Sequence, residues 1–308
     1  MSIDPSYLEY AQRHYGMDHD RYDWSMLSER KPVAWPKGKT LALWVNVNLQ
    51  FYPLNQQGKP FKVPGGMTMP YPDLRHFSLR DYGNRVGLYR VLGALDRFGL
   101  KNTLTVNSRL LERTPYLTAL IKDRGDEVLA HGEHMDALHY GGQDVAEETG
   151  QINRSLNVLR EATGQPVTGW LSPVRSESEN TPDLLANHGI EYFCDWVNDD
   201  MPYRFRTSSR SLTAMPLPLE IEDRFVIINN LHSEASWAEQ VLDSADFLET
   251  EASEQGGRIL SLNIHPWLMG QPHRIKHLER VLENLSARSS VWSAGAGEIC
   301  SAWSSHQD

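Results

Sequence analysis

The chain has 308 residues and a formal net charge of −10, from 30 Lys and Arg against 40 Asp and Glu. An acidic surface repels nucleic acid and anionic membranes, so both are excluded as partners and a small molecule is favoured. The two cysteines, Cys194 and Cys300, do not have the pattern of a disulfide framework. The N-terminal sequence lacks the features of a signal peptide, and no run of about 18 apolar residues is present, so we expect a cytoplasmic protein.

Residues 1–36 are predicted to form an N-terminal arm, followed by a single domain over residues 37–308. The arm begins with a helix candidate at residues 5–15 and continues in a segment with several Pro, Trp and Tyr residues. Aromatic side chains are favoured at interfaces, and nine tryptophans exceed what a core requires, so the arm indicates contact with a second subunit. The alternative, in which the arm packs on its own domain, is equally open.

The first strand is predicted at residues 39–49, a continuous apolar run into which Asn46 and Asn48 intrude. Because side chains along a strand alternate with a period of two, both amides lie on the same face. The stretch that follows, residues 52–81, is rich in Gly and Pro and is predicted to be a long loop. A loop of this length could close over a binding site as a lid.

From residue 85 onward, predicted helices and strands alternate. The helices are predicted where apolar residues recur at helical spacing, and several end at a glycine such as Gly99 or Gly164. The predicted strands cover residues 102–107, 127–131, 167–171, 191–196, 212–217, 225–230 and 258–265, and the predicted helices cover residues 85–98, 115–124, 145–163, 181–188, 237–252 and 275–285. This alternation predicts a mainly parallel sheet, and the number of repeats favours a barrel over an open sheet.

Proton-transfer and metal-binding groups gather where the third predicted strand ends. His131, His134 and His139 fall within nine positions, together with Glu133 and Asp136. His131 follows the strand directly, which places it at the edge of the sheet. His134 and His139 can equally be exposed loop residues without a role in chemistry.

Polar residues at the C-terminal ends of barrel strands converge on one mouth. Any single one of them can instead cap a helix or tie down a loop. As a set they predict a site, whose candidate members are Asn46, Asn48, Gln50, Asn107, His131, Ser172, Asp195, Asp199, Asn229, Asn230 and His265.

Several short motifs, in this order, resemble the polysaccharide deacetylase (NodB-homology) superfamily. They are Arg80-Asp-Tyr-Gly-Asn-Arg85, Gly169-Trp-Leu-Ser-Pro173, Asn180-Thr-Pro-Asp-Leu-Leu185, Asp195-Trp-Val-Asn-Asp-Asp200, Ile264-His-Pro266 and Gly270-Gln-Pro272. They are most similar to the branch that contains cofactor-independent allantoinase and related cyclic-amide hydrolases. The resemblance covers residues 21–285 and implies an α/β fold, a distorted (β/α) barrel with about seven parallel strands. It also implies a homo-oligomer, with a tetramer as one form.

The chain departs from the metal-binding pattern of this superfamily. Metal-dependent deacetylases carry an Asp pair at the end of the first strand and a His-x-x-x-His motif after the third. Here Asn46 and Asn48 occupy the first pair, and Met135 stands four residues after His131. Amide and thioether groups are poor zinc ligands, so the usual site is lost and no cofactor is expected. A rearranged site for a divalent metal such as zinc stays open, built from three of the residues His131, His134, Asp136 and His139.

The favoured function is hydrolysis of a non-peptide C–N bond in a small cyclic amide, imide or ureide. Such a reaction needs a base for water, donors for the oxyanion and an acid for the leaving nitrogen. His131 is the candidate base or water-positioning residue and His265 the candidate acid or oxyanion donor, because imidazole titrates near neutrality and suits either task. Glu133 and Asp199 are expected to orient these histidines. The expected substrate-binding residues are Asn46, Asn48, Gln50, Asn107, Ser172 and Trp196.

Two other functions remain open from the sequence. The first is a metal-dependent N-deacetylase that acts on a carbohydrate, which the missing ligands and the acidic chain disfavour. The second is a catalytically degenerate barrel that binds a small molecule or serves as a structural subunit. One further departure bears on the substrate, because Gln50 stands where allantoinase-like relatives often carry a carboxylate.

Overall fold

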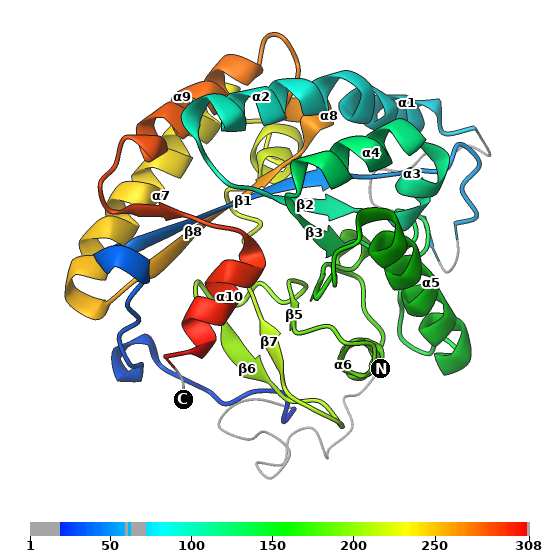
Figure 1. Cartoon of the computed structure of the whole chain (residues 1–308), viewed down its shortest axis with the longest axis horizontal. Helices are drawn as coiled ribbons and strands as arrows, with labels where there is room; N and C mark the ends of the chain where they lie inside the picture. Colours follow the sequence, from blue (N-terminus) through cyan, green and yellow to red (C-terminus); the bar gives the residue numbers. More distant parts are fainter. Residues whose placement is uncertain (1–18, 59–60, 63–71, 307–308) are drawn as a thin grey trace.

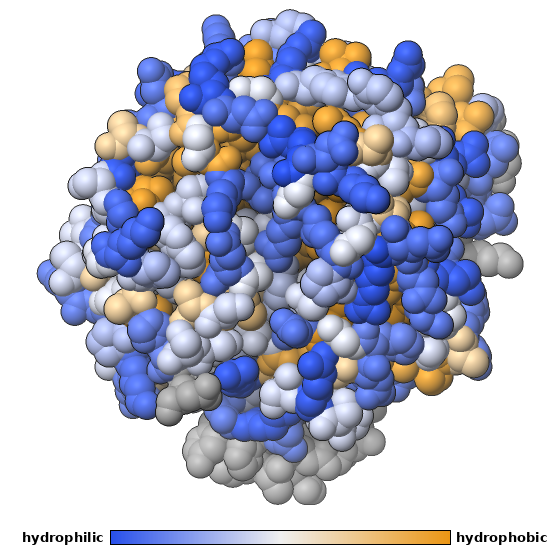
Figure 2. All heavy atoms as spheres, viewed as in Figure 1, coloured by the Kyte–Doolittle hydropathy of each residue, from blue (hydrophilic) through white to orange (hydrophobic). Residues whose placement is uncertain are grey.

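The computed structural model describes residues 19–58, 61–62 and 72–306. The helix expected at residues 5–15 and the middle of the predicted loop at residues 52–81 lie outside these ranges. None of the helices within them combines the length and the hydrophobicity that a membrane span requires. Figure 2 shows hydrophilic and hydrophobic side chains interspersed over one face of the molecule.

A curled, mostly parallel sheet forms the centre of the molecule (Figure 1). The described strands are β1 (Leu41–Leu49), β2 (Thr103–Val106), β3 (Glu127–Ala130), β4 (Gly169–Trp170), β5 (Tyr192–Phe193), β6 (Tyr203–Phe205), β7 (Leu212–Ala214), β8 (Arg258–Ile264) and β9 (Val291–Ser293). They are hydrogen-bonded in the order β6-β7-β5-β4-β3-β2-β1-β8, and β9 pairs with β1. Among the described pairings only β6 with β7 is antiparallel. The expected distorted (β/α) barrel is confirmed, and its sheet path ends at β6 and β8.

Helices form the outer layer of this barrel, and Figure 1 shows α2, α4, α5, α7 and α9 along the outer side of the strands. Their bounds are α1 (Leu74–Tyr82), α2 (Leu88–Phe98), α3 (Ser108–Arg113), α4 (Pro115–Arg124), α5 (Val145–Thr163), α6 (Thr181–Asn187), α7 (Glu234–Gln255), α8 (Pro266–Met269), α9 (Ile275–Ser286) and α10 (Ala296–Ser304). The apolar faces of these helices, such as Leu95 of α2 and Leu282 of α9, join Val45 and Val47 of β1 in the main core. The helical spacing of apolar residues thus places each helix against the sheet.

β1 lies next to the end of the sheet path, between β2 and β8. All nine of its residues are buried, and it pairs in parallel with β2 on one side and β8 on the other. Its register with β8 sets Asn46 opposite Asn263. The polar residues of the two strands therefore meet inside the barrel, where an isolated amide would be costly to bury.

One strand prediction is wrong. Residues 225–230 do not form a strand, because Phe225–Asn229 is a π-helix (η8) between β7 and β8. A short apolar run does not distinguish a strand from a buried helical turn. The residues just before it, Glu222 and Asp223, hydrogen-bond to Asn263 and His265, which anchors the segment at the end of β8.

The prediction of a loop over residues 52–81 is wrong at its C-terminal end. Residues 74–82 form α1, and the side chain of Asp73 caps this helix by accepting a hydrogen bond from the backbone N–H of His76. The helix was obscured because its apolar residues are few, and it is polar on most sides. The sequence also gave no signal for the short elements β6, β9, α3, α8 and α10.

The described part of the predicted arm, residues 19–36, packs on its own domain. The indole of Trp35 is 2% exposed and donates a hydrogen bond to the backbone carbonyl of Arg258 at 2.9 Å. Arg21 forms an ion pair with Asp183 at 3.1 Å. In this part of the chain the arm therefore covers its own barrel, as in the second of the two alternatives.

Candidate active site

The C-terminal ends of β1 and β8 and the residue after β3 meet in one narrow cavity. Five of the predicted site residues line it, namely Asn48, Gln50, His131, Ser172 and His265. The cavity has a volume of about 30 Å³, room for one or two water molecules. A larger cavity of about 430 Å³ shares Gln50, Tyr52 and Arg80 with it.

A tight turn places His131 in this cavity. β3 ends at Ala130, and the backbone N–H of His131 still bonds to the carbonyl of Val106 at the end of β2. The next residue, Gly132, has a φ of +65°, and Pro173 fills the space in which a Cβ would lie. Only glycine accepts this backbone conformation readily, so the His-Gly pair is a requirement of the turn.

His131 presents an unprotonated nitrogen to the cavity. Its Nδ1 lies 2.6 Å from the backbone carbonyl of Leu171, and because a carbonyl can only accept, Nδ1 carries the proton. The other ring nitrogen, Nε2, is buried and has no hydrogen-bond partner among the described residues. Burial lowers the pKa of His131 to about 4, so the neutral ring holds a free lone pair at neutral pH.

His265 is held by a buried carboxylate. Asp223 accepts a hydrogen bond from Nδ1 of the ring at 2.6 Å and from the backbone N–H of His265 at 2.7 Å. Burial raises the pKa of Asp223, while the adjacent imidazole offsets part of that shift. The two bonds fix the ring orientation and leave Nε2 on the cavity side.

An amide network connects β1 to β8 behind these histidines. The side-chain N–H groups of Asn46 and Asn48 both donate to Oδ1 of Asn263 at 2.7 Å. Asn263 in turn donates to Glu222 at 2.7 Å. Burial works to raise the pKa of Glu222, but the charges of His265, Arg175 and Arg224 lower it to about 2. The amide network therefore ends at the ionised carboxylate of Glu222.

The side chains at the deacetylase metal positions do not fit a metal ion. Asn46 and Asn48 direct their N–H groups to Asn263, and the amide oxygen of Asn46 accepts from Thr105, so the pair does not provide the two carboxylates of the deacetylase site. Met135 occupies the position of the second histidine and lines the cavity with a thioether. Within the described ranges, no group of three His, Cys, Asp or Glu residues is placed to hold a metal ion.

The other two histidines that follow the third predicted strand, His134 and His139, are engaged elsewhere. His139 is buried, and its Nδ1 lies 3.3 Å from Glu148, a carboxylate that also accepts from Ser178 and Thr181. His134 accepts a hydrogen bond from the backbone N–H of Asp136 at 3.2 Å, and burial lowers its pKa to about 4. The rearranged cluster considered from the sequence is thus not assembled by the described residues.

Two predicted substrate-binding amides are used inside the protein. Asn107 accepts from the backbone N–H of Phe51 at 2.8 Å and donates to the carbonyl of His131, which ties the ends of β1 and β3 together. Asn46 is fully buried, and its carbonyl accepts from Thr105 at 2.6 Å. Neither side chain lines the cavity.

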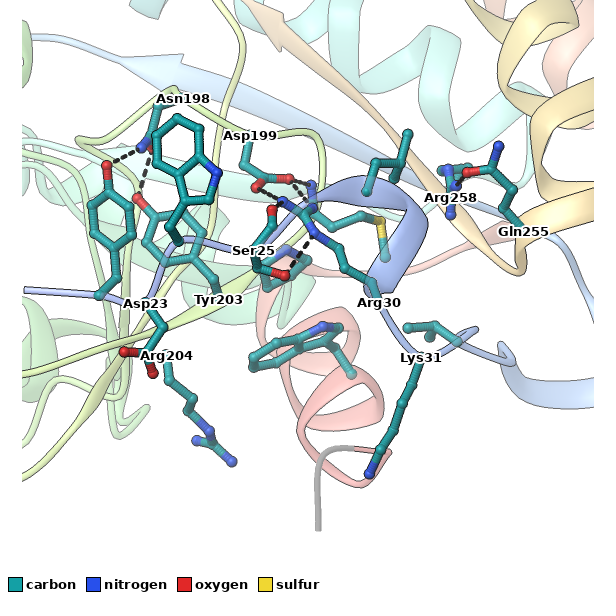
Figure 3. Close-up of a pocket in the computed structure, with 17 residues that line it drawn as sticks. Asp23, Ser25, Arg30, Lys31, Asn198, Asp199, Tyr203, Arg204, Gln255 and Arg258 are labelled. Carbon is teal, nitrogen blue, oxygen red and sulfur yellow. Dashed lines mark hydrogen bonds and ion pairs between the residues drawn. The ribbon is translucent and has the colours of Figure 1, made fainter. Parts of the chain in front are cut away.

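Three further predicted residues lie outside the cavity. Glu133 forms an ion pair with Arg154 at 2.7 Å. Asp199 binds Arg30 with both oxygens at 2.7 Å, in a separate pocket of about 430 Å³ next to the N-terminal segment (Figure 3). Trp196 packs against aromatic neighbours and donates to Glu177 at 3.0 Å. None of these contacts orients His131 or His265.

The residues that sequence reasoning missed are mostly charged. Asn263 could have been found, because it lies two positions before His265 on the same strand and so on the same face. Asp223 gave no signal, since its pairing with His265 spans 42 residues. The remaining missed residues of the cavity are Arg80, Arg175, Glu222 and Arg224.

Comparison with known proteins agrees with the motifs. Residues 80–193 match the model of the polysaccharide deacetylase family. A Schizosaccharomyces pombe protein named as a polysaccharide deacetylase is 23% identical over 307 residues, which covers 89% of this chain and 94% of that protein. The peptidoglycan deacetylase of Helicobacter pylori is 22% identical over 68% of this chain and 81% of its own length. The resemblance expected from the motifs is confirmed.

Solved structures confirm the fold. The crystal structure of PuuE allantoinase superposes with a TM-score of 0.78, at 23% sequence identity, and the match covers 95% of this chain and 96% of that one. At this level of identity the likeness concerns the barrel and its connections.

Proposed function

We propose that this chain, a hydrolase of carbon–nitrogen bonds from the polysaccharide deacetylase family, opens a small cyclic amide, imide or ureide without the deacetylase metal site. One observation carries the proposal. The free Nε2 of His131 and the carboxylate-held ring of His265 line the same cavity, at the point where metal ligands have been replaced. The allantoinase that shares the fold supports a cyclic-amide substrate.

His131 serves as the base in this scheme. Its Nε2 takes a proton from water while the water oxygen bonds to the ring carbonyl carbon. A negative charge develops on the carbonyl oxygen, and the N–H donors of the cavity stabilise it. The low pKa of His131, about 4, keeps the ring unprotonated and ready to accept at neutral pH.

His265 serves as the acid. When both ring nitrogens carry protons, Asp223 holds Nδ1–H at 2.6 Å and compensates the positive charge. Nε2 then gives its proton to the leaving ring nitrogen as the C–N bond breaks. The products are a carboxylic acid, which ionises, and a free amine or urea nitrogen on the same open chain. Proton exchange with water restores both histidines.

The test compares wild type, His131→Ala and His265→Ala on hydantoins, cyclic imides and ureides. We expect turnover by the wild type and a loss of about 10²- to 10⁴-fold in kcat/KM in each variant. His277→Ala, in α9 away from the cavity, is the matched control and should keep full activity. Unchanged activity in both site variants, or no turnover of any compound by wild type, would favour the degenerate binding barrel.

The names of the sequence relatives support a second candidate, a metal-dependent N-deacetylase acting on a carbohydrate. It predicts release of acetate from N-acetylglucosamine oligomers, abolished by a chelator and restored by zinc or cobalt. The proposed cyclic-amide reaction should instead continue at the same rate in chelator. The two readings are separated by running both substrate classes with and without chelator.

A further inference from the structure

Arg80 is a buried cation that lacks a carboxylate partner in the described part of the chain. It is 6% exposed, and its guanidinium lies between the rings of Tyr52 and Trp267, at 4.4 and 4.3 Å from their centroids. Its Nε donates weakly to the amide oxygen of Gln50 at 3.4 Å. Burial lowers the pKa of Arg80, which reflects the cost of holding this charge away from water.

The aromatic contacts do not offset this cost. A cation–π contact is a weak attraction, and the cost of burying an unpaired ion exceeds it. Buried ions in proteins are therefore usually paired with an opposite charge. Here the side chain of Arg80 lines a cavity. The charge of Asp73 acts on Arg80 from a distance, but this carboxylate pairs with His76 at 2.8 Å, so a ligand that enters the cavity can supply a directly bound counter-charge.

The other charged groups around the cavity leave it positive. Arg224 binds Glu222 at 2.9 Å, and Arg175 lies 3.5 Å from the same carboxylate, so one acid serves two guanidinium groups. Asp223 is engaged by His265. The cavity wall and Asp223 behind it thus contain three guanidinium groups and two carboxylates, an excess of positive charge that favours an anionic ligand.

We propose that the substrate carries a carboxylate beside its ring amide, and that Arg80 binds this carboxylate. The inference rests on the proposed hydrolysis of a cyclic amide in the same cavity. A guanidinium matches a carboxylate because its N–H groups form a fork that can donate two parallel hydrogen bonds. Arg80 also lines the larger cavity of about 430 Å³, which gives a ring substituent room beside the histidines.

The experiment uses a pair of probes that differ in charge but hardly in shape, hydantoin-5-acetate and hydantoin-5-acetamide. In the wild type we expect kcat/KM to be about 10- to 100-fold higher for the carboxylate, as for hydrogen bonds to charged groups. Arg80→Gln should bring the ratio of the two kcat/KM values close to one. Arg80→Lys keeps the charge without the fork and should give an intermediate ratio.

Arg97→Gln is the matched control, because Arg97 lies on the outer surface of α2 and pairs with Glu279. It should leave the ratio at the wild-type value. Thermal unfolding of each variant shows whether it is folded. If Arg80→Gln does not fold, the ratio in the wild type and the ratio in Arg80→Lys test the inference. A wild type that prefers the acetamide, or a preference that survives Arg80→Gln, overturns the inference.

Calorimetric titration of both probes separates this inference from the proposed function. If the wild type hydrolyses neither probe, the proposed reaction fails for this ring. Tighter binding of the acetate, lost in Arg80→Gln, would still support the carboxylate site. Equal affinity for the two probes, or no binding of either, overturns it.

Discussion

Replacing Asp223 by asparagine removes one charge and one hydrogen-bond acceptor from the group that holds His265. The carboxylate accepts three N–H bonds, from His265 Nδ1 at 2.6 Å, from the His265 backbone at 2.7 Å and from the Arg224 backbone at 2.6 Å. Two reach Oδ1 and one reaches Oδ2, so an amide in either orientation sets its N–H₂ group against at least one backbone N–H. We expect a loss of about 1–3 kcal/mol in the free energy of unfolding for the unsatisfied donor.

The effect on catalysis should be larger. One amide orientation forces the ring of His265 into the tautomer with the proton on Nε2 alone, and neither orientation compensates a positively charged ring. We expect kcat/KM to fall by about 10²- to 10⁴-fold on any compound that the wild type hydrolyses. Nitrogen NMR of the histidine rings gives a second readout, since it shows which ring nitrogen of His265 carries the proton in the variant.

Glu127→Gln is the matched control for this experiment. Glu127 is a half-buried carboxylate in the sheet, where it accepts hydrogen bonds from Tyr192 and the Gly297 backbone at the opposite end of β3 from His131. Its loss should lower stability but not the rate of the folded enzyme. If Asp223→Asn keeps kcat/KM within twofold of wild type while His265→Ala is inactive, Asp223 does not position His265.

Two further predictions concern pH and packing. Because His131 must be neutral and burial lowers its pKa to about 4, the acidic limb of kcat/KM should have an apparent pKa near 4, and a limb near 6.5, the value for an exposed histidine, would contradict this. The same group binds a proton more readily when unfolded, so the free energy of unfolding should fall by up to about 3 kcal/mol as pH drops from 6.5 through 4. Gly87→Ala should lower the free energy of unfolding by about 3 kcal/mol or more in urea titrations, because a Cβ there lies 2.0 Å from the carbonyl oxygen of Pro266. Gly93→Ala, exposed in the adjoining helix with nothing within 4 Å, should raise it by about 1 kcal/mol, and equal effects would refute the packing argument.

The elements that were predicted well are those whose signal is local. The apolar run of β1 and the helical spacing of α2 and α5 each specify a period within one segment, and the structure follows them. The run at residues 225–230 failed because four apolar residues fit a strand and a helical turn equally. Its conformation depends on Glu222 and Asp223, which are bound to the end of β8.

The candidate site likewise has residues whose positions were expected from the sequence and residues whose positions were not. His131, His265 and Asn48 were found because strand ends of a parallel barrel converge, a rule that needs only the order of the strands. Glu133 was expected to orient these histidines because it lies two residues after His131, and Asp199 because it follows the fifth predicted strand. Their carboxylates instead bind Arg154 and Arg30, because an ionised side chain takes the nearest cation that lets it stay near water.

The sequence by itself determined the class of fold, the edge of the sheet that carries polar residues, and the replacement of metal ligands by Asn46, Asn48 and Met135. Only the tertiary structure decided which charges face one another. Asp223 reaches His265 from a segment 42 residues away, and Arg80 stands between Tyr52 and Trp267 without a carboxylate among the described residues. Such pairings depend on side-chain distances of a few ångström between separate segments, and no periodic pattern within one segment encodes them.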